Sequence, residues 1–197
     1  MKQHFNIVLL GAPGSGKGTQ ARLISEKYNL DHVSTGELFR QEIASQSPVG
    51  LHVKEIIEQG NLCPDNLTLD MLVHHINTYV NNNGFIFDGV PRTIDQAKMI
   101  DGIGYHQTIP ITVVIDIQVD EAEVTDRIVK RSQLEGRSDD VIHILKQRIS
   151  NYFELTKPLE YYYAEQGKIQ TINGMQSIET VFETICSILD NIPTYKN

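Results

Sequence analysis

Gly11-Ala-Pro-Gly-Ser-Gly-Lys-Gly-Thr19 is the stretch that decides the fold of this 197-residue chain, and it directly follows the apolar run Phe5–Leu10. A buried strand, a glycine-rich loop and a helix predicted to begin near Thr19 follow one another in that order. In such a loop several backbone N–H groups point inward, and the helix N-terminus adds partial positive charge. Lys17 adds a full positive charge, so this segment is predicted to hold a polyphosphate.

The spacing Gly11-x4-Gly16-Lys17 matches the phosphate-binding loop, with one departure. The pattern has Ser or Thr directly after the lysine, whereas this chain has Gly18 and then Thr19. The alternative is a glycine-rich turn that binds nothing. The order of strand, glycines, lysine and helix favours the phosphate loop over that alternative.

Composition limits the classes of protein to which the chain can belong. Hydrophobic residues make up 40% and charged residues 21%, which is ordinary for a soluble globular protein of one domain with small inserted lobes. The apolar runs are too short for a membrane span or a signal peptide, so a cytoplasmic protein is expected. The net charge of −8 argues against broad nucleic-acid binding. Cys63 and Cys186 stand far apart in the sequence and are expected to be reduced thiols.

Apolar runs rich in Val, Ile and Phe alternate with helical patterns along the chain. This alternation predicts an α/β fold with a five-stranded parallel sheet covered by helices on both faces. The strands are expected at 5–10, 32–33, 85–87, 111–117 and 169–172. Helices are expected after Pro64-Asp65, around 124–129, from about 139 through Leu155, and after Ser177 as N-cap. Residues 34–63 and 132–138 fit the sheet poorly and are expected to be excursions from it.

An acidic residue ends the third predicted strand. Asp88 directly follows the apolar residues 85–87. An acid at the end of a buried strand near a phosphate loop commonly orders Mg²⁺ and its waters. The alternative is an ordinary turn aspartate before Gly89.

The next residues carry a cation and an amide. Pro91 stiffens the turn and presents Arg92 at the carboxyl edge of the sheet, where open parallel sheets bind their ligands. Gln96 lies about one helical turn further on and can point the same way. Because an amide both donates and accepts hydrogen bonds, Gln96 suits the edge of a nucleobase, whereas a surface glutamine is the plain alternative.

Seven arginines offer the local positive charge that an anionic ligand needs in a chain of net charge −8. A guanidinium group grips phosphate oxygens by two parallel hydrogen bonds. Arg127 and Arg131 are four residues apart and share a helix face, and Arg40 lies about one turn into a helix that Thr35 can cap. The other arginines at motif edges are Arg92, Arg137 and Arg148. Any one alone is expected to be a solvated surface residue, but together they predict a second phosphate group opposite the loop.

Histidines are absent from these motifs, and no Ser–His–Asp order can be drawn. A reaction whose nucleophile is already an anion needs no general base. Transfer of a phosphoryl group onto another phosphate is such a reaction, and positioning with charge neutralisation then carries most of the catalysis.

Taken together, these motifs resemble the adenylate kinase family across nearly the whole chain. Nucleoside monophosphate kinases commonly have Gly-Lys-Gly-Thr in the loop, which accounts for Gly18. The resemblance implies a P-loop NTPase-type fold and reversible, Mg²⁺-dependent phosphoryl transfer from ATP to AMP, giving two ADP. The matching segments are Gly11–Gln20, Ser34–Arg40, Asp88–Thr93, Gln96, Arg127, Arg131, Gly136–Asp140 and Arg148.

The resemblance also implies which residues bind each nucleotide. Those implied to bind ATP are Gly14, Ser15, Gly16, Lys17, Gly18, Thr19, Arg127, Arg131 and Gln176. Those implied to bind AMP are Thr35, Arg40, Asn61, Leu62, Cys63, Gly89, Val90, Pro91, Arg92, Gln96, Arg137 and Arg148. Those implied to act in catalysis are Lys17, Arg92, Arg131, Arg137 and Arg148, and Asp88 is implied to hold Mg²⁺ through water.

The implied organisation is one kinase domain over residues 1–197, with an AMP-binding lobe at 34–63 and a short lid at 131–141. A short lid lacks the longer insert that can carry zinc-binding cysteines, so no structural zinc is expected. ATP, AMP and ADP are the expected partners of a monomer that binds neither nucleic acid nor membrane. Val90 departs from the usual Phe, which is expected to loosen packing beside the AMP site only mildly.

Two alternatives stay open at this point. A UMP/CMP kinase of the same fold is the nearer one, although Thr93 and Gln96 favour AMP because pyrimidine-specific relatives tend to be Asn-rich there. A nucleotide-dependent switch is the other. A GTPase would carry an Asn/Thr-Lys-x-Asp motif, and Thr156-Lys157-Pro158-Leu159 lacks the aspartate.

Overall fold

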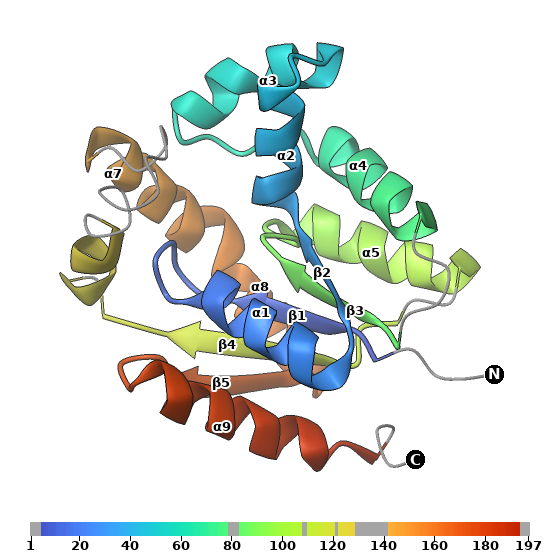
Figure 1. The fold of residues 1–197 in the computed structure, drawn as a ribbon, viewed down its shortest axis with the longest axis vertical. Helices are drawn as coiled ribbons and strands as arrows, with labels where there is room; N and C mark the ends of the chain where they lie inside the picture. Colours follow the sequence, from blue (N-terminus) through green and yellow to red (C-terminus); the bar gives the residue numbers. More distant parts are fainter. Residues whose placement is uncertain (1–4, 79–82, 108–109, 121, 129–141, 194–197) are drawn as a thin grey trace.

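A single five-stranded sheet, with all strands parallel and in the order β2-β3-β1-β4-β5, forms the centre of the molecule (Figure 1). The computed structural model describes residues 5–78, 83–107, 110–120, 122–128 and 142–193. The strands are β1 (Ile7–Leu10), β2 (Asp31–Ser34), β3 (Phe85–Asp88), β4 (Val113–Gln118) and β5 (Ile169–Asn173). The sheet predicted from the sequence is therefore confirmed, because every predicted strand is present in the expected chain order.

Helices cover both faces of this sheet because the β1 side chains alternate between two apolar layers. Ile7 and Leu9 pack with α1 (Lys17–Tyr28) and α9 (Ile178–Asp190) on one face. The opposite face has Val8 and Leu10 packed against three further helices. These are α4 (Asp65–Thr78), α5 (Ile94–Gln107) and α8 (Pro158–Glu165). Such burial of both faces is the usual environment of a parallel sheet.

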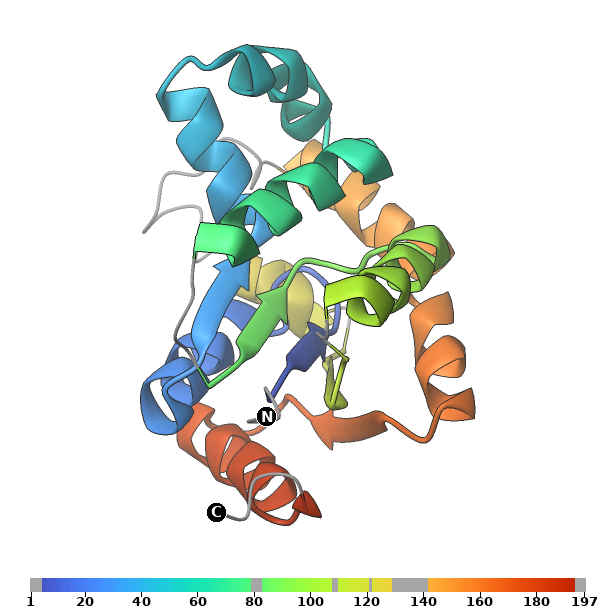
Figure 2. The ribbon, with the colours of Figure 1, turned by 90° about the vertical axis from the view of Figure 1, so that its right-hand side faces the viewer.

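The excursion predicted after the second strand forms two helices that project away from the sheet (Figures 1 and 2). They are α2 (Thr35–Ala44) and α3 (Pro48–Glu58). Gly50 lets them cross closely, since a Cβ there would lie 2.1 Å from the carbonyl oxygen of Glu42. Phe39, Val53 and Cys63 form a small apolar cluster of their own between these helices and the start of α4. This pair of helices thus has an apolar cluster of its own, while Leu38 near the start of α2 packs against the main core.

The long helix expected from about residue 139 through Leu155 is not continuous. α7 (Ile142–Asn151) gives way to a π-helical turn, η1 (Tyr152–Thr156), in which the Lys157 N–H donates to the Tyr152 carbonyl over 2.8 Å. The wider turn rotates Phe153 and Leu155 away from the buried face of the helix, and they are 49% and 37% exposed. α8, which follows directly, was not predicted.

The helix predicted around 124–129 is present over residues 122–128. Val124 and Ile128 are buried in a cluster with Leu145 of α7, and Ala12 of the glycine-rich loop packs against it. This helix therefore supports the loop from below. No helix among the described residues is long and apolar enough to cross a membrane.

Candidate active site

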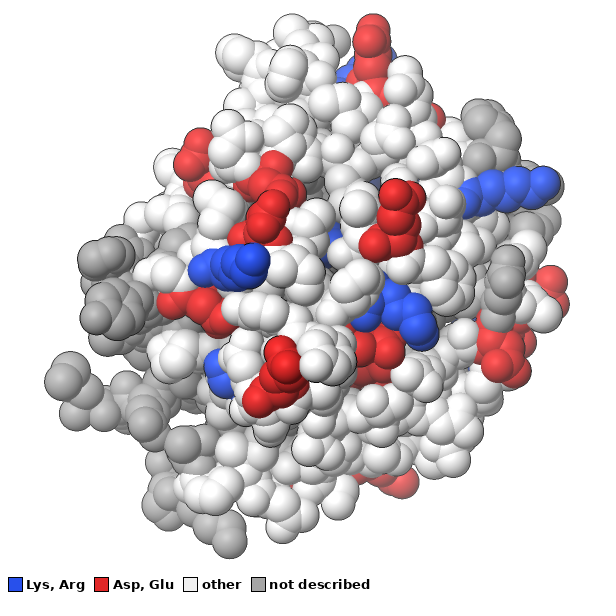
Figure 3. Space-filling view, turned by 180° about the vertical axis from the view of Figure 1, so that it is seen from behind, with Lys and Arg blue, Asp and Glu red and all other residues white. Residues whose placement is uncertain are grey.

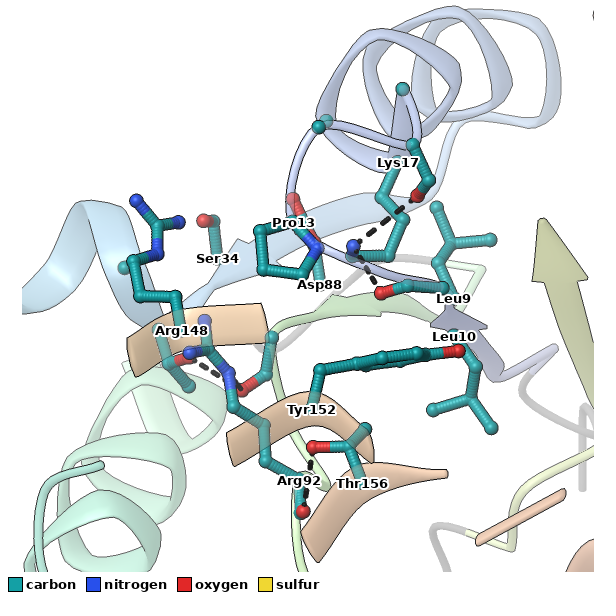
Figure 4. A pocket seen from close by; sticks show the side chains of 18 of the residues that line it. Leu9, Leu10, Pro13, Lys17, Ser34, Asp88, Arg92, Arg148, Tyr152 and Thr156 are labelled. Carbon is teal, nitrogen blue, oxygen red and sulfur yellow. Dashed lines mark hydrogen bonds between the residues drawn. The ribbon is translucent and has the colours of Figure 1, made fainter. Parts of the chain in front are cut away.

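A pocket of about 710 Å³ opens at the carboxyl edge of the sheet. The ends of β1, β2 and β3 line it through Leu10, Ser34 and Asp88, and α7 and η1 close one side through Arg148 and Tyr152 (Figure 4). The described residues predicted for the site all line this pocket except Val90, which is buried in the core beneath it. Arg131, Arg137 and the segment 131–141 expected as a lid lie outside the described residues.

The glycine-rich loop depends on backbone conformations that side chains disfavour. Gly11 has φ +140°, and a Cβ there would lie 2.5 Å from the carbonyl oxygen of Ile117. Gly16 has φ +98° and caps α1, which begins at Lys17 rather than near Thr19 as predicted. Gly16 therefore ends the loop in the left-handed region and sends the chain straight into the helix, so that the first free N–H groups of α1 face the pocket edge.

The Lys17 ammonium group holds the loop closed. Nζ donates to the carbonyl oxygens of Gly11 and Ala12 over 2.6 and 2.8 Å, and it lies 3.4 Å from the Ser15 hydroxyl (Figure 4). The positive charge is thus placed inside the curve of the loop, where the backbone N–H groups of an anion-binding loop also converge.

A second cation ties this loop to the turn after β5. Arg127 pairs through Nε with Glu123 over 2.7 Å, and it donates to the carbonyl oxygens of Ser15 over 3.4 Å and Gly174 over 3.0 Å. Gln176 is exposed and lines the same end of the pocket. Arg127 and Gln176 therefore bracket the pocket next to the loop, on the side away from β2.

Hydrogen bonds from Thr35 and Arg92 join the ends of β2 and β3. Thr35 was expected to cap the helix after β2, but that role belongs to Ser34, whose hydroxyl accepts from Glu37 N. The Thr35 hydroxyl instead donates to the Gly89 carbonyl over 2.9 Å, and Arg92 Nε donates to the same oxygen over 2.8 Å. This shared acceptor fixes the two side chains relative to each other at the pocket wall.

Gln96 is buried behind Arg92 rather than exposed. Only 2% of its surface is accessible, so the alternative of a surface glutamine is wrong. Its Oε1 accepts from the backbone N–H of Arg92 over 2.7 Å, and its Nε2 donates to Asp65 over 2.7 Å. Thr156 of η1 donates from the other side to the carbonyl of Arg92 over 2.9 Å. The backbone at Arg92 is therefore held from both directions.

The environment of Asp88 suits a metal-bound water. Burial alone would raise the pKa of this carboxyl, but the adjacent His32 ring and the charges of Lys17 and Arg92 outweigh it and lower the pKa. Asp88 Oδ2 lies 3.6 Å from His32 Nε2, and a Cβ at Gly18 would lie 3.4 Å from the same oxygen. A charged hard oxygen beside open space is what Mg²⁺ and its waters need, so Asp88 fits the ion.

The remaining predicted residues line the far end of the pocket. Arg92 and Arg148 lie on one side and Lys17 on the other (Figure 4). Arg40 of α2 and the segment 61–63 complete that end. Burial raises the pKa of the Cys63 thiol to about 11, against the opposing charge of Arg92, so this thiol is neutral.

Arginine and lysine side chains on the reverse side of the molecule are scattered singly among acidic and uncharged residues (Figure 3). In the pocket, by contrast, six cationic side chains come together. They are Lys17 and Arg22 of α1, with Arg40, Arg92, Arg127 and Arg148 from four other segments. The acidic chain therefore concentrates positive charge at this one edge of the sheet, as its sequence suggested.

Several lining residues were missed from the sequence. Asn151 donates to the Gly60 carbonyl over 2.9 Å, and Tyr152 and Thr156 face the pocket from η1. Their spacing of three, four and eight residues after Arg148 was the available signal, because such spacings share one helix face. Among the described residues, no group of three or more His, Cys, Asp or Glu side chains is arranged to hold a metal ion.

A buried acid below the loop was also missed. Asp116 of β4 stands opposite Leu10 in the sheet and has 0% of its surface exposed. Gln118 donates to its Oδ2 over 2.9 Å, but Oδ1 has no hydrogen-bond partner. Burial, reinforced by the charge of Glu160, raises the pKa of Asp116, and the bond from Gln118 opposes this only in part.

A parallel sheet whose first strand runs through a glycine-rich loop into a helix, with a lysine and several arginines around one pocket, defines a nucleotide-binding phosphotransferase of the P-loop class. The family model for adenylate kinase matches residues 9–168 of the chain. This chain belongs to the adenylate kinase family and is a nucleoside monophosphate kinase.

Curated relatives agree with this assignment. An adenylate kinase of Azobacteroides pseudotrichonymphae is 46% identical over 188 residues, which is 95% of this chain and 98% of that protein. Adenylate kinases of Bacteroides fragilis and Porphyromonas gingivalis are 42% and 36% identical, over 95% and 98% of this chain and the whole of each relative. The alternative of a UMP/CMP kinase is not favoured by these matches.

Asp116→Asn is expected to stabilise the protein at neutral and alkaline pH. Because the folded pKa of Asp116 lies above its unfolded value, the native state binds more protons, and stability falls as pH rises from about 3.9 through the folded pKa. The amide keeps the shape and the bond from Gln118 but carries no charge to bury. Urea unfolding from pH 4 to pH 8 should show a gain that grows with pH.

Asp70→Asn on the exposed face of α4 is the matched control, since it removes the same charge from a solvated position. It should change the free energy of unfolding by less than about 0.5 kcal/mol at every pH. A lower stability of Asp116→Asn than of the parent at pH 8 would mean that the carboxylate is favourably paired.

Proposed function

We propose that this chain transfers the terminal phosphoryl group of ATP reversibly to AMP, giving two ADP. The observation that carries the proposal is the placement of two cation sets around one pocket. Lys17 stands within the phosphate loop, and Arg92 and Arg148 stand across the pocket from it. A second set of several arginines across the pocket suits a second anionic phosphate as the acceptor.

The reaction joins two anions, so its main obstacle is their mutual repulsion. An oxygen of the AMP phosphate attacks the terminal phosphorus of ATP, and the bond from that phosphorus to the bridging oxygen breaks as ADP leaves. The attacking oxygen already carries charge, so no residue needs to accept a proton. Fixed cations and the loop N–H groups stabilise the charge on the transferring group, and holding both nucleotides in line supplies the rest.

The ATP site of this proposal is the loop end of the pocket. Residues 14–19 take the phosphates, and Lys17 exchanges its bonds to the loop carbonyls for bonds to phosphate oxygens. Arg127 and Gln176 stand where the adenosine of ATP would leave the loop. Asp88 would hold Mg²⁺ through water, and the ion would supply neutralising charge to the ATP phosphates.

The AMP site of this proposal is the end lined by α2, the segment 61–63 and the turn after β3. Arg40, Arg92 and Arg148 take the phosphate, and Thr35 and Gln96 face the base. Residues 34–63 form the AMP-binding lobe, supported by the apolar cluster that α2 and α3 form with the start of α4. By the family resemblance, 131–141 is the short lid and contributes Arg131 and Arg137. Closure of the two inserts would exclude water, which competes with AMP as the acceptor.

We further propose that the protein works as a monomer in the cytoplasm. Both cysteines are free and buried, as in proteins of reducing compartments. Among the described residues, the large exposed apolar side chains come from several elements, from α3 to α9; they include Leu51, Met99, Phe153, Tyr161 and Ile178.

The direct test offers the purified protein ATP-Mg²⁺ with AMP, UMP, CMP or GMP in separate assays that measure ADP. AMP is expected to be the preferred acceptor by at least about tenfold, since the polar groups at Gln96 match one base edge. Equal rates with UMP would contradict the base assignment. ADP formed without any monophosphate, together with free phosphate, would contradict the kinase assignment.

Arg92→Ala is expected to lower kcat by about 10²- to 10³-fold, the usual cost of removing one charge-stabilising donor. The free energy of unfolding should fall by about 1 kcal/mol, the usual effect of losing a hydrogen bond such as that from Arg92 to Gly89. Steady-state kinetics and urea unfolding check both numbers. Lys98→Ala, on the exposed side of α5, is the control and should change neither. Unfolding of the Arg92 variant at room temperature would make Arg92 a structural residue.

A further inference from the structure

The side-chain amide of Gln96 lies between two neighbours of opposite hydrogen-bonding character. Its Oε1 accepts from the backbone N–H of Arg92 over 2.7 Å, and its Nε2 donates to Asp65 Oδ1 over 2.7 Å. A backbone N–H can only donate, and a carboxylate can only accept at neutral pH. One of the two amide orientations therefore satisfies both neighbours, and the flipped orientation satisfies neither.

Asp65 is itself held in place by the start of the next helix. Its Oδ2 accepts from the Thr93 hydroxyl over 3.0 Å, and that hydroxyl accepts from the backbone N–H of Gln96 over 3.0 Å. This closed set of bonds joins the first turns of α4 and α5, which lie side by side (Figures 1 and 2). Because Gln96 is 2% exposed, no bulk water is present to compensate a flipped amide.

Gln96 lines the pocket, whereas Asp65 does not. After the two internal bonds are made, the amide still has one Nε2 hydrogen and one Oε1 lone pair to offer. Asp65 and the Arg92 N–H fix the orientation of the amide. They therefore determine where the free Nε2 hydrogen and where the free Oε1 lone pair face the pocket. Asp65 thus acts on a ligand only through Gln96.

We propose that Asp65 is a positioning residue that makes the acceptor-nucleotide site select adenine over the 6-oxopurines hypoxanthine and guanine. The proposal rests on the proposed function, in which Gln96 faces the AMP base. Adenine presents an amino donor at C6 beside an acceptor at N1, whereas hypoxanthine and guanine present an acceptor at C6 beside a donor at N1. A freely turning amide would match both patterns by flipping, but an amide fixed by Asp65 matches one.

A simpler role for Asp65 has to be separated from this one. An acidic residue in the first turn of α4 also stabilises the helix through its N-terminal N–H groups. That role predicts a change in stability without a change in base preference. The readout is therefore the ratio of kcat/KM values for two purine nucleotides, since a purely structural effect lowers both kcat/KM values together.

The experiment measures kcat/KM with ATP-Mg²⁺ and either AMP or inosine monophosphate, whose hypoxanthine base differs from adenine chiefly at this edge. The parent protein is compared with Asp65→Asn, whose amide can donate or accept. The ratio of kcat/KM for AMP to kcat/KM for inosine monophosphate is expected to fall at least about tenfold. The reason is that the carboxylate, which only accepts from Gln96, is replaced by an amide that can either accept from it or donate to it. Asp95→Asn, an exposed neighbour of Gln96 with the same change of charge, should leave the ratio unchanged.

Asp65→Ser provides a second variant, since serine keeps a good helix-start residue while its hydroxyl can both donate and accept. It should lower the ratio as Asp65→Asn does, and both variants should unfold cooperatively in a thermal scan. A folded Asp65→Asn protein with an unchanged ratio would overturn the inference. Failure of both variants to fold would also overturn it, because Asp65 would then be required for the fold itself.

Gln96→Ala separates this inference from the function on which it rests. If Gln96→Ala abolishes the preference for AMP and Asp65→Asn does not, the inference about Asp65 is wrong and the proposed base contact stands. If Gln96→Ala leaves the preference unchanged, the proposed base contact is itself wrong.

Discussion

The contact between the Lys17 ammonium group and the carbonyl oxygens of Gly11 and Ala12 is the interaction on which the site depends. Lys17 is the first residue of α1, and its side chain reaches back across the loop that precedes the helix. Its Nζ lies 2.6 Å from the Gly11 oxygen and 2.8 Å from the Ala12 oxygen. The loop can curve this tightly because Gly11 and Gly16 adopt positive φ angles that side chains disfavour. The result is a positively charged concavity directly at the end of a buried strand.

Everything else at the site is placed relative to that concavity by the parallel sheet. Because β1, β2 and β3 all end at the same edge, the turns that follow them meet around one pocket. Thr35 and Arg92 share the Gly89 carbonyl, and Thr156 holds the Arg92 backbone from η1. An acidic protein thereby gathers cations from five elements without gaining a basic surface. The two nucleotide sites that we propose are the two ends of this pocket.

The sequence was sufficient to predict the sheet, the phosphate loop and a set of site residues whose described members, Val90 excepted, line one pocket. These features depend on short patterns: apolar runs, glycine spacing, and a proline before Arg92. The sequence did not reveal where hydrogen bonds go, because that depends on partners far away in the chain. Ser34 and Thr35 are both good capping residues, and the carbonyl of Gly89, 54 residues after Thr35, decides which of them caps α2.

The continuous helix predicted through Leu155 and the overlooked Asp116 have a similar cause. Nothing in the apolar spacing of residues 142–155 distinguishes an α-helix from one that widens at Tyr152, so one continuous helix through Leu155 was predicted. Asp116 was overlooked because it lies within an apolar strand, where a carboxylate carries no motif. Gln96 was rightly expected near the pocket, but its clamp by Asp65 follows only from the packing of α4 on α5.

The most direct test of the account is calorimetric titration of Lys17→Met with ATP-Mg²⁺ and, separately, with AMP. The side chain keeps its length and loses its charge. ATP affinity is expected to fall by about tenfold or more while AMP affinity stays at the parent value, because Lys17 belongs to one end of the pocket only. Equal losses for both nucleotides, or an unchanged affinity for ATP, would contradict it.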